Sequence, residues 1–552
     1  MTRGSDYFKK VASAVVDDWL ELEPEYATQL GEHRYDGALD DRSERGISQK
    51  ASAYRRHRDA VREIDEAGLD VDDRTDREIL LGALEERIFT LEELREIEWD
   101  PLVYNPGDAI YPLTARETTP VSDRLRSIAS RLEQVPELLE AAQRQLAHPP
   151  KIHVETALLQ NGGTISLVDD EVSRLLGSDR SLASLVEPAQ DAALAALRRH
   201  GSFLEDLLKV ADGDFRLGPD RFARKLQLTL DSSLSASDIL ERADNHLESV
   251  TDEIEQVSRA YLDDNGLDSA GDRRETIRSA LEHVARVRPD DDSVVATATS
   301  ALERAGQAVR DGGIVTVPED EMVVEVMPEF RRGVAVAYCD APGPLDNGGR
   351  TFLAVAPTPE DWPSERVGSF YREYNTAMIL NLIVHEAMPG HAVQLAHGRR
   401  FNGSTPVRQV FMSGSFIEGW AVHAERLMAA AGLGGNAVRL QQLKMQLRMT
   451  INAILDAKVQ AGGMTESQAL DLMTVRGFQE EGEAAGKWRR ACLTSAQLST
   501  YFVGYTELAD AFGSLEPKLR DGFDPVLAHG SPPPRHLSQL VTAGSNPGTS
   551  SR

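Results

Sequence analysis

Apolar residues recur at helical spacing throughout roughly the first 300 residues of the chain. Two clear stripes are formed by Leu80, Leu84, Ile88 and Leu91 and by Leu125, Ile128, Leu132 and Val135. Each stripe lies on one face of a 3.6-residue repeat, with Glu and Arg filling the opposite face of the first. The stripes follow no fixed period, so we expect packed amphipathic helices and not a solenoid of identical repeats.

The pattern changes between Gly312 and Pro357. The runs IVTV, MVVEVM, GVAVAYC and TFLAVA are short, alternating or rich in β-branched residues, and proline or glycine separates them. Such runs are typical of strands. The helical pattern returns after Trp362 and continues to about Val541. The sequence therefore predicts a mainly α protein with a small β-sheet insert.

This pattern divides the chain into four segments. Residues 1–310 are expected to form a helical lobe, 311–360 the small sheet, and 361–542 a second helical lobe. The polar residues 543–552 are too small to pack and are expected to be disordered. Nothing near residue 310 resembles a flexible linker, so we expect one packed body with two lobes.

Composition and charge exclude several classes of protein. The 552 residues are 41% hydrophobic and 27% charged, as in ordinary globular proteins. The 89 acidic residues against 60 basic ones give a net charge of −29. Nucleic acid and anionic membrane surfaces are therefore not expected as partners, because both attract basic proteins.

Cysteine usage and the N-terminal segment predict a cytoplasmic protein. Only Cys339 and Cys492 are present, too few for a disulfide framework and without the spacing of a cysteine zinc site. Asp17, Asp18 and Glu21 interrupt the apolar positions near the N-terminus, so no signal-peptide core is expected there.

Candidate chemistry concentrates between residues 385 and 423, where four of the 13 histidines lie. The segment IVHEAMPGHAVQ places Glu386 beside His385, with His391 six residues further on. Two imidazoles and a neighbouring carboxylate are what a hydrolytic zinc site requires. The pattern predicts His385 and His391 as ligands, and Glu386 as the base that takes a proton from the attacking water.

The six-residue spacing of the histidines does not suit a regular helix. At about 100° per residue, the two side chains would point about 120° apart. Pro389 and Gly390 lie between them, and proline removes a helical hydrogen bond and displaces the preceding turn. We therefore expect a kink or bulge that brings His391 back toward His385.

The segment SFIEGWAVHAERL is the best source of a third ligand. Glu418 and Glu425 are seven residues apart and share a helical face. One of the two carboxylates can bind the metal while the other orients a ligand histidine. His423 points elsewhere on a regular helix and is at most a neighbour of the site.

These segments resemble the paired signatures H-E-x-x-P-G-H and E-G-W-A-x-x-x-E of the bacterial domain-of-unknown-function family 885. The resemblance covers nearly the whole chain, including a Gln-x-x-x-Tyr-x-x-Gly motif at Gln497, Tyr501 and Gly504. Two positions depart from the family pattern: His423 replaces a tyrosine, and Ser495-Ala496 replaces a Pro-Gly pair.

The family in turn resembles helical zinc metallopeptidases that have a glutamate ligand on a later helix. This resemblance implies a two-lobed, mostly helical body with a deep cleft. It also implies one zinc ion per chain, held by His385, His391 and Glu418. It supports a class of reaction and does not identify a substrate.

Further residues are candidates for binding the substrate. Tyr501 is preferred to Tyr505 as the donor to the oxyanion, because Tyr501 belongs to the glutamine motif. The strand Thr351 to Ala356 is expected to offer an edge along which an extended peptide could pair.

Three arginines could bind the C-terminal carboxylate of a peptide through a bidentate fork. Arg490 is preferred, with Arg489 and Arg535 as alternatives, and each could equally be an ordinary salt-bridging residue.

The sequence leaves three functional hypotheses. The first is a cytoplasmic zinc peptidase that hydrolyses short peptides. The second is a metal-site protein that binds a peptide or small molecule without turnover. The third is a helical scaffold without metal.

Overall fold

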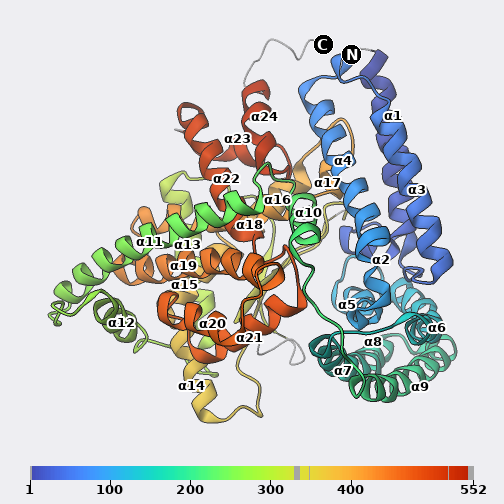
Figure 1. Cartoon of the computed structure of the whole chain (residues 1–552), viewed down its shortest axis with the longest axis horizontal. Helices are drawn as coiled ribbons and strands as arrows, with labels where there is room; N and C mark the ends of the chain where they lie inside the picture. Colours follow the sequence, from blue (N-terminus) through green and yellow to red (C-terminus); the bar gives the residue numbers. More distant parts are fainter. Residues whose placement is uncertain (1–2, 328–335, 347, 520, 545–552) are drawn as a thin grey trace. The chain divides into compact units, whose positions relative to one another are not determined.

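The computed structural model describes residues 3–327, 336–346, 348–519 and 521–544 (Figure 1). These residues belong to two compact units. The first spans residues 1–216, 342–349 and 403–411, and the second spans 217–341, 350–402 and 412–552. The boundary expected near residue 310 thus lies inside the second unit. The predicted disordered tail lies outside the described residues from position 545 onward.

The first unit is built from helices and their connecting turns. Its α-helices are α1 (Arg3–Leu22), α2 (Pro24–Leu30), α3 (Glu44–Arg62), α4 (Val71–Phe89), α5 (Gly107–Ala115), α6 (Val121–Gln145), α7 (Lys151–Ser166), α8 (Val172–Ser178), α9 (Ala183–Leu208) and α17 (Val407–Val410).

The predicted apolar stripes hold this unit together. Leu125, Ile128, Leu132 and Val135 on α6 are all fully buried in its core, which confirms the second stripe. On α4, Leu80 and Leu84 are fully buried, whereas Ile88 is only partly buried. Side-chain caps begin two of these helices: Ser43 accepts from Gly46 N before α3, and Asp70 accepts from Asp73 N before α4.

The second unit contains the sheet and the remaining helices. Its α-helices are α10 (Pro219–Leu230), α11 (Ala236–Asp264), α12 (Arg273–Val284), α13 (Val294–Gly312), α14 (Ser364–Glu373), α15 (Thr376–Glu386), α16 (His391–Arg400), α18 (Gly414–Ala430), α19 (Gly435–Gln460), α20 (Glu466–Asp471), α21 (Glu481–Leu493), α22 (Thr500–Leu515), α23 (Asp524–Leu527) and α24 (Leu537–Gly544).

The sheet has three strands in the order β1-β3-β2, formed by β1 (Met322–Val326), β2 (Ala337–Asp340) and β3 (Thr351–Val355). Strand β3 pairs with β1 in parallel and with β2 in antiparallel fashion. The prediction that Thr351 to Ala356 offers a sheet edge is therefore wrong, because partners occupy both sides of β3. A mainly α fold with a small sheet is confirmed.

The IVTV run, residues 314–317, is not a strand. Side chains bind its backbone in place of a neighbouring strand: Thr316 N donates to the Asp524 carboxylate at 2.8 Å, and Thr316 O contacts His397 Nε2 at 2.7 Å. Val315 is nevertheless buried in the core of the unit. The apolar residues of this run thus reflect burial and not strand pairing.

Helix α15 runs through the core of the second unit. Its residues Met378, Ile379, Ile383 and Val384 are at most 2% exposed and pack with helices α13 and α18. Asn375 caps the helix by accepting a hydrogen bond from Met378 N at 3.1 Å. The core therefore fixes the axis and the rotation of α15, and with them the direction of the side chains in its last turn.

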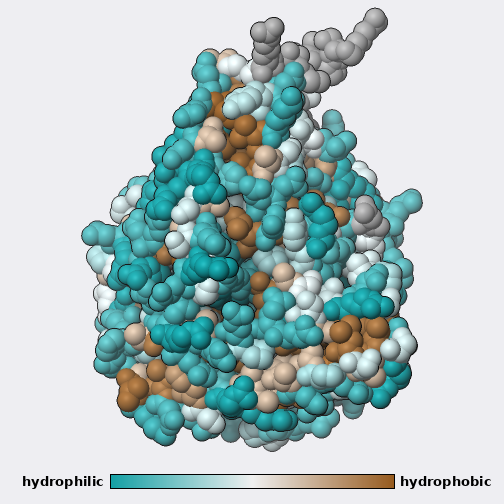
Figure 2. All heavy atoms as spheres, turned by 90° about the vertical axis from the view of Figure 1, so that its right-hand side faces the viewer, coloured by the Kyte–Doolittle hydropathy of each residue, from teal (hydrophilic) through white to brown (hydrophobic). Residues whose placement is uncertain are grey.

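Hydrophilic residues cover most of the face shown in Figure 2, and apolar residues form small separate patches there. Within the described residues, no helix combines the length and the hydropathy that crossing a bilayer requires.

Candidate metal centre

The two histidines of the H-E-x-x-P-G-H motif lie on two consecutive helices. Helix α15 ends with His385 and Glu386, the chain turns through residues 387–390, and α16 begins at His391. The irregularity expected at Pro389 is thus a complete break, with a cis peptide between Met388 and Pro389.

Gly390 allows this turn to be tight. A Cβ atom at Gly390 would lie 1.8 Å from the carbonyl oxygen of His385, closer than any side chain permits. Gly390 N donates instead to Val384 O at 3.0 Å, which binds the turn to the end of α15. As a result the His385 and His391 rings lie 4.7 Å apart, centre to centre.

In the part of the chain that the structure describes, one group of side chains could hold a metal ion: His385, His391 and Glu418. One ligand atom from each lies within 4.8 Å of the others. Glu418 Oε2 is 3.4 Å from His385 Nε2 and 3.5 Å from His391 Nε2. Two atoms bound about 2.0–2.2 Å from a tetrahedral zinc ion would be about 3.3–3.6 Å apart, so this spacing suits zinc.

The burial of the Glu418 carboxylate oxygen also supports a zinc site. Glu418 Oε2 is buried and has no hydrogen-bond partner within normal distance among the described residues. A buried carboxylate is costly unless a cation neutralises it, and either a protonated imidazole or a metal ion bound between Glu418 and the two imidazoles would do so. Nitrogen and oxygen donors of this kind are those that zinc binds in proteins.

Glu425 holds His385 from the other side of its ring. Its Oε1 lies 2.7 Å from His385 Nδ1, and its Oε2 accepts from Asn381 Nδ2 at 2.6 Å. Both Glu425 and Asn381 are 2% exposed. Of the two carboxylates on α18, Glu418 thus joins the histidine group, while Glu425 fixes the orientation of the His385 ring. Asn381 was not predicted, although its place one turn before His385 in an apolar run was a signal.

Two motif glycines bring α18 and α22 close together. A Cβ at Gly419 would lie 2.4 Å from the backbone of Gly504, and one at Gly504 would lie 1.9 Å from Ser415 O. Trp420 adds a hydrogen bond from its Nε1 to Pro389 O at 2.9 Å. These contacts set the position of Glu418 relative to the turn that carries His391 and to the start of α22.

Glu386 faces the sheet. Its Oε2 accepts a hydrogen bond from the backbone N–H of Cys339 on β2 at 3.1 Å. This N–H points away from β3, so Glu386 lies beside β2 on the side opposite β3. Glu386 follows His385 in the sequence, but its carboxylate does not belong to the group formed by His385, His391 and Glu418.

Tyr501 lies at the start of α22, with its ring centre 6.5 Å from that of His385. The Arg490 guanidinium donates twice to Gln497 Oε1, at 3.1 and 2.8 Å. The preceding turn is held by Asp456, whose carboxylate accepts from Ala496 N and Ser499 N, both at 3.0 Å. The structure therefore brings Tyr501, Gln497 and Arg490 together near the histidine group.

Three other predicted residues lie elsewhere. The His423 ring stacks on Tyr505 at 4.6 Å, and its Nε2 contacts Tyr505 O at 3.1 Å. The hydroxyl of Tyr505 accepts from Arg426 and Gln446. Arg535 pairs with the Asp231 carboxylate at 2.9 Å. None of these three side chains belongs to the histidine group among the described residues.

The electrostatics of the group follow from burial and close charges. Burial favours a lower pKa for His385, but the carboxylates of Glu418 and Glu425 raise it well above its usual value. Burial opposes ionisation of Glu418, yet the two imidazoles hold its pKa below the usual value. The Glu418 charge and burial raise the pKa of Tyr501, so its phenol keeps the proton. Burial lowers the pKa of His423 to about 3, as expected for a neutral core residue.

Two solved structures are similar to this chain over nearly its whole length. One, described as "a putative lipoprotein of unknown function" from Shewanella oneidensis, is 27% identical with a TM-score of 0.80. The match covers 97% of this chain and 99% of that one. The other, described as "the putative lipoprotein from Colwellia psychrerythraea", is 15% identical, has a TM-score of 0.80 and covers 99% of both chains. The second likeness shows a shared fold only.

A comparison with curated proteins gives no match. The descriptions of the two similar structures contradict the predicted cytoplasmic location, which was wrong. That prediction rested on the cysteine count and on the polarity of the N-terminal segment, and neither feature reports on lipid attachment. The model of the family described as bacterial protein of unknown function matches residues 24–541, and the chain therefore belongs to the family DUF885.

Proposed function

We propose that this protein is a zinc-dependent peptidase that hydrolyses short peptides. The observation that carries the proposal is the Glu418 oxygen, which lies 3.4 and 3.5 Å from two imidazole nitrogens and lacks a hydrogen-bond partner among the described residues. The carboxylate of Glu386, which accepts a hydrogen bond from Cys339 N, follows His385 directly in the sequence. Three protein ligands and a neighbouring base are the arrangement that hydrolytic zinc sites use.

When bound, zinc supplies Lewis-acid chemistry, because it polarises a carbonyl oxygen and lowers the pKa of water toward about 7. His385, His391 and Glu418 would hold the ion, and Glu425 would keep the His385 ring in place. Glu386 takes a proton from the attacking water and passes it to the leaving amine. The hydrogen bond from Cys339 N keeps this carboxylate in position.

We expect an extended peptide to lie along β2 on the side opposite β3. The backbone of Cys339 on this edge meets Glu386, so a peptide pairing with β2 would pass beside the base. Main-chain pairing gives affinity with little selectivity for side chains. Arg490, held by Gln497, is the cation near Tyr501 that we expect to bind a substrate carboxylate.

Tyr501 is proposed as the donor to the developing oxyanion. Changing Tyr501 to Phe should lower kcat about 100-fold and change KM less than about 3-fold, because the bond forms mainly in the transition state. Steady-state kinetics on a short peptide would measure both constants. Tyr505→Phe is the matched control and should keep kcat within about 3-fold, since that hydroxyl contacts Arg426 and Gln446 instead. Equal losses in the two variants would rule out this role.

Glu425 is proposed to set the affinity for zinc through His385. Its replacement by Gln preserves the shape of the side chain but removes the charge that holds His385 Nδ1–H. Zinc affinity should fall about 10- to 100-fold, as measured by competition with a chromogenic chelator. An unchanged affinity would show that Glu425 has only a packing role.

Removing the metal tests the proposed function directly. Dialysis against a chelator should abolish hydrolysis of short peptides, and one equivalent of zinc should restore it. Elemental analysis must show that the dialysed protein is free of metal. Full peptidase activity in metal-free protein would refute the proposal.

A further inference from the structure

Lys487 on α21 is a buried lysine without an anionic partner. Its side chain is 7% exposed, and in the part of the chain that the structure describes its ammonium group makes no ion pair or hydrogen bond. Ala484 and Ala491, three residues before it and four after it, are fully buried, so Lys487 lies on the packed face of α21. Lysines are almost never buried unless they are paired, because burial opposes the charge. The missing partner is an anion that a ligand could supply.

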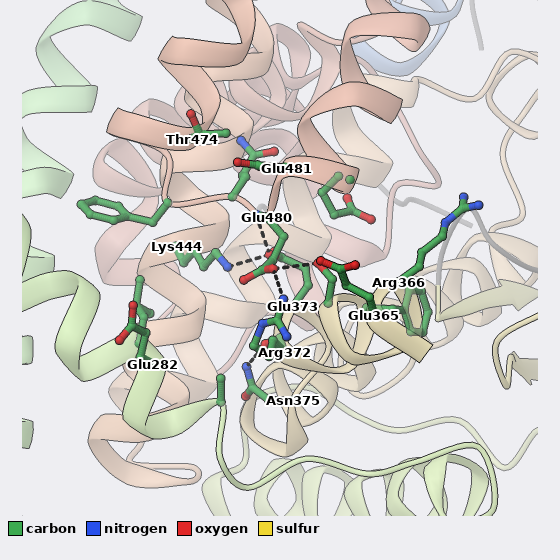
Figure 3. A pocket seen from close by; sticks show the side chains of 18 of the residues that line it. Glu282, Glu365, Arg366, Arg372, Glu373, Asn375, Lys444, Thr474, Glu480 and Glu481 are labelled. Carbon is green, nitrogen blue, oxygen red and sulfur yellow. Dashed lines mark hydrogen bonds and ion pairs between the residues drawn. The ribbon is translucent and has the colours of Figure 1, made fainter. Parts of the chain in front are cut away.

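The two carboxylates on this side of α21 are already balanced by other cations. Glu483, one turn before Lys487, accepts a hydrogen bond from Arg448 at 2.6 Å. Glu373 accepts from Lys444 at 2.8 Å and also lies 3.9 Å from Arg448. Figure 3 shows Lys444 directed toward Glu373 in the wall of a pocket of about 670 Å³, which Lys487 does not line. Two carboxylates thus neutralise two cations, and the charge of Lys487 remains unbalanced.

Arg490 lies one turn after Lys487 and connects it to the candidate metal centre. Residues three apart are neighbours on the surface of a helix, so the two cationic side chains start from adjacent positions. Among the described residues the Arg490 guanidinium binds neutral groups, donating to Gln497 Oε1 at 3.1 and 2.8 Å and to the Tyr501 hydroxyl. The Tyr501 ring centre is 6.5 Å from that of His385. The unbalanced positive charge therefore extends to the side of the histidine group.

The electrostatics of Lys487 also favour a bound anion. Burial lowers the pKa of Lys487 well below its usual value, and the charges of Arg448 and Arg490 lower it further, while Glu483 offsets only part of this effect. A carboxylate between Lys487 and Arg490 would make charge-assisted hydrogen bonds to both, which are stronger than those between neutral groups. The two oxygens of a carboxylate also match the fork of N–H groups on a guanidinium.

We propose that Lys487 and Arg490 together form a subsite that binds a carboxylate of the peptide substrate. In naming the ligand a substrate, this inference rests on the proposed peptidase function. Because Arg490 contacts Tyr501, the proposed donor to the oxyanion, the carboxylate lies close to the bond that is cut. The C-terminus of a peptide and the side chain of Asp or Glu offer the same group. Lys487 thus makes the protein prefer peptides with a negative charge at this position.

Isothermal titration calorimetry on the metal-free full chain tests the subsite without turnover. The probes are tetra-alanine with a free C-terminus, its C-terminal amide, and amides in which one alanine is replaced by Glu. At least one peptide with a carboxylate should bind with a Kd below about 1 mM, at least about 10-fold more tightly than the tetra-alanine amide. Preference for the free acid identifies the C-terminus as the ligand, and preference for a Glu peptide identifies a side chain.

Hydrolysis of the same peptides by the zinc-loaded chain separates the subsite from the proposed function. The peptide that binds most tightly through its carboxylate should also have the highest kcat/KM. Carboxylate-selective binding without any hydrolysis would refute the peptidase proposal while supporting the subsite. No binding up to about 10 mM, or a preference for carboxylate below about 10-fold, would overturn the subsite.

Lys487→Met removes the charge and keeps an unbranched side chain. Binding of the preferred carboxylate peptide should weaken at least about 10-fold, whereas the affinity for zinc should change less than about 3-fold. Lys10→Met, at an exposed position of α1, is the matched control and should change neither. Unchanged peptide affinity in folded Lys487→Met, or equal losses of peptide and zinc, would contradict the role of Lys487. The wild-type titrations test the subsite even if this variant does not fold.

Discussion

Replacement of Glu386 by Gln is expected to lower kcat by at least about 1,000-fold while the zinc content stays at one ion per chain. The amide keeps the size of the side chain and can still pair with Cys339 N through its oxygen. It cannot accept a proton from water, so the general base is lost. Elemental analysis and steady-state kinetics on one preparation separate these two effects.

Glu303→Gln is the matched control for this experiment. Glu303 is an exposed residue of α13, and the same chemical change there should leave both kcat and zinc content unaltered. If Glu386→Gln keeps more than about a tenth of the wild-type kcat, Glu386 is not the base. A protein that only binds peptides would instead show no turnover in the wild type and equal peptide affinity in the variant.

Replacement of Glu418 by Gln should weaken zinc binding at least about 1,000-fold, because the charged ligand between the two imidazoles becomes a neutral amide. The affinity can be measured by competition with a chelator of known strength. This loss should exceed the 10- to 100-fold effect expected for Glu425→Gln, since Glu425 contacts His385 and would not touch the ion.

The relative zinc affinities of the Glu418→Gln and Glu425→Gln variants distinguish the roles of the two carboxylates. If Glu425→Gln lost more zinc than Glu418→Gln, the roles of the two carboxylates on α18 would be exchanged. If neither variant lost zinc, the group formed by His385, His391 and Glu418 would not be the site of the metal.

Helix periodicity predicted most of the fold, because burial determines which positions can be apolar. The stripe on α6 is fully buried, and the second unit is helical after the sheet, as expected. The sequence could not show that Thr351 to Ala356 forms a central strand. Strand order depends on contacts between residues far apart in the chain. A short apolar run does not show which other strands lie beside it in the sheet.

The candidate site was predicted in its residues but not in its local geometry. His385, His391 and Glu418 lie together, as the family resemblance implied, whereas the spacing alone left Glu418 and Glu425 open as the third ligand. A complete helix break, in place of the expected kink or bulge, joins the two histidines. The close approach of Gly419 to Gly504 was not predicted. Glycines inside two apolar helical motifs were the available signal, since such positions often mark contact between backbones.

The turn before Gln497 departs from the family pattern at Ala496, and this departure strains the backbone. Ala496 occupies the position where the family pattern has glycine, and its φ of 66° lies in the left-handed region. An alanine there is strained by about 1 kcal/mol. Asp456, which binds the backbone N–H of Ala496, helps to hold this conformation, and so positions Gln497 and Tyr501.

X-ray absorption at the zinc edge, on protein purified without chelator and reconstituted with one equivalent of zinc, tests whether His385, His391 and Glu418 bind the metal. We expect a first shell of nitrogen and oxygen at about 2.0–2.2 Å with the outer-shell scattering of two imidazoles. This signal should be lost in the Glu418→Gln variant. A shell without imidazole, or a spectrum that Glu418→Gln leaves unchanged, would contradict this assignment.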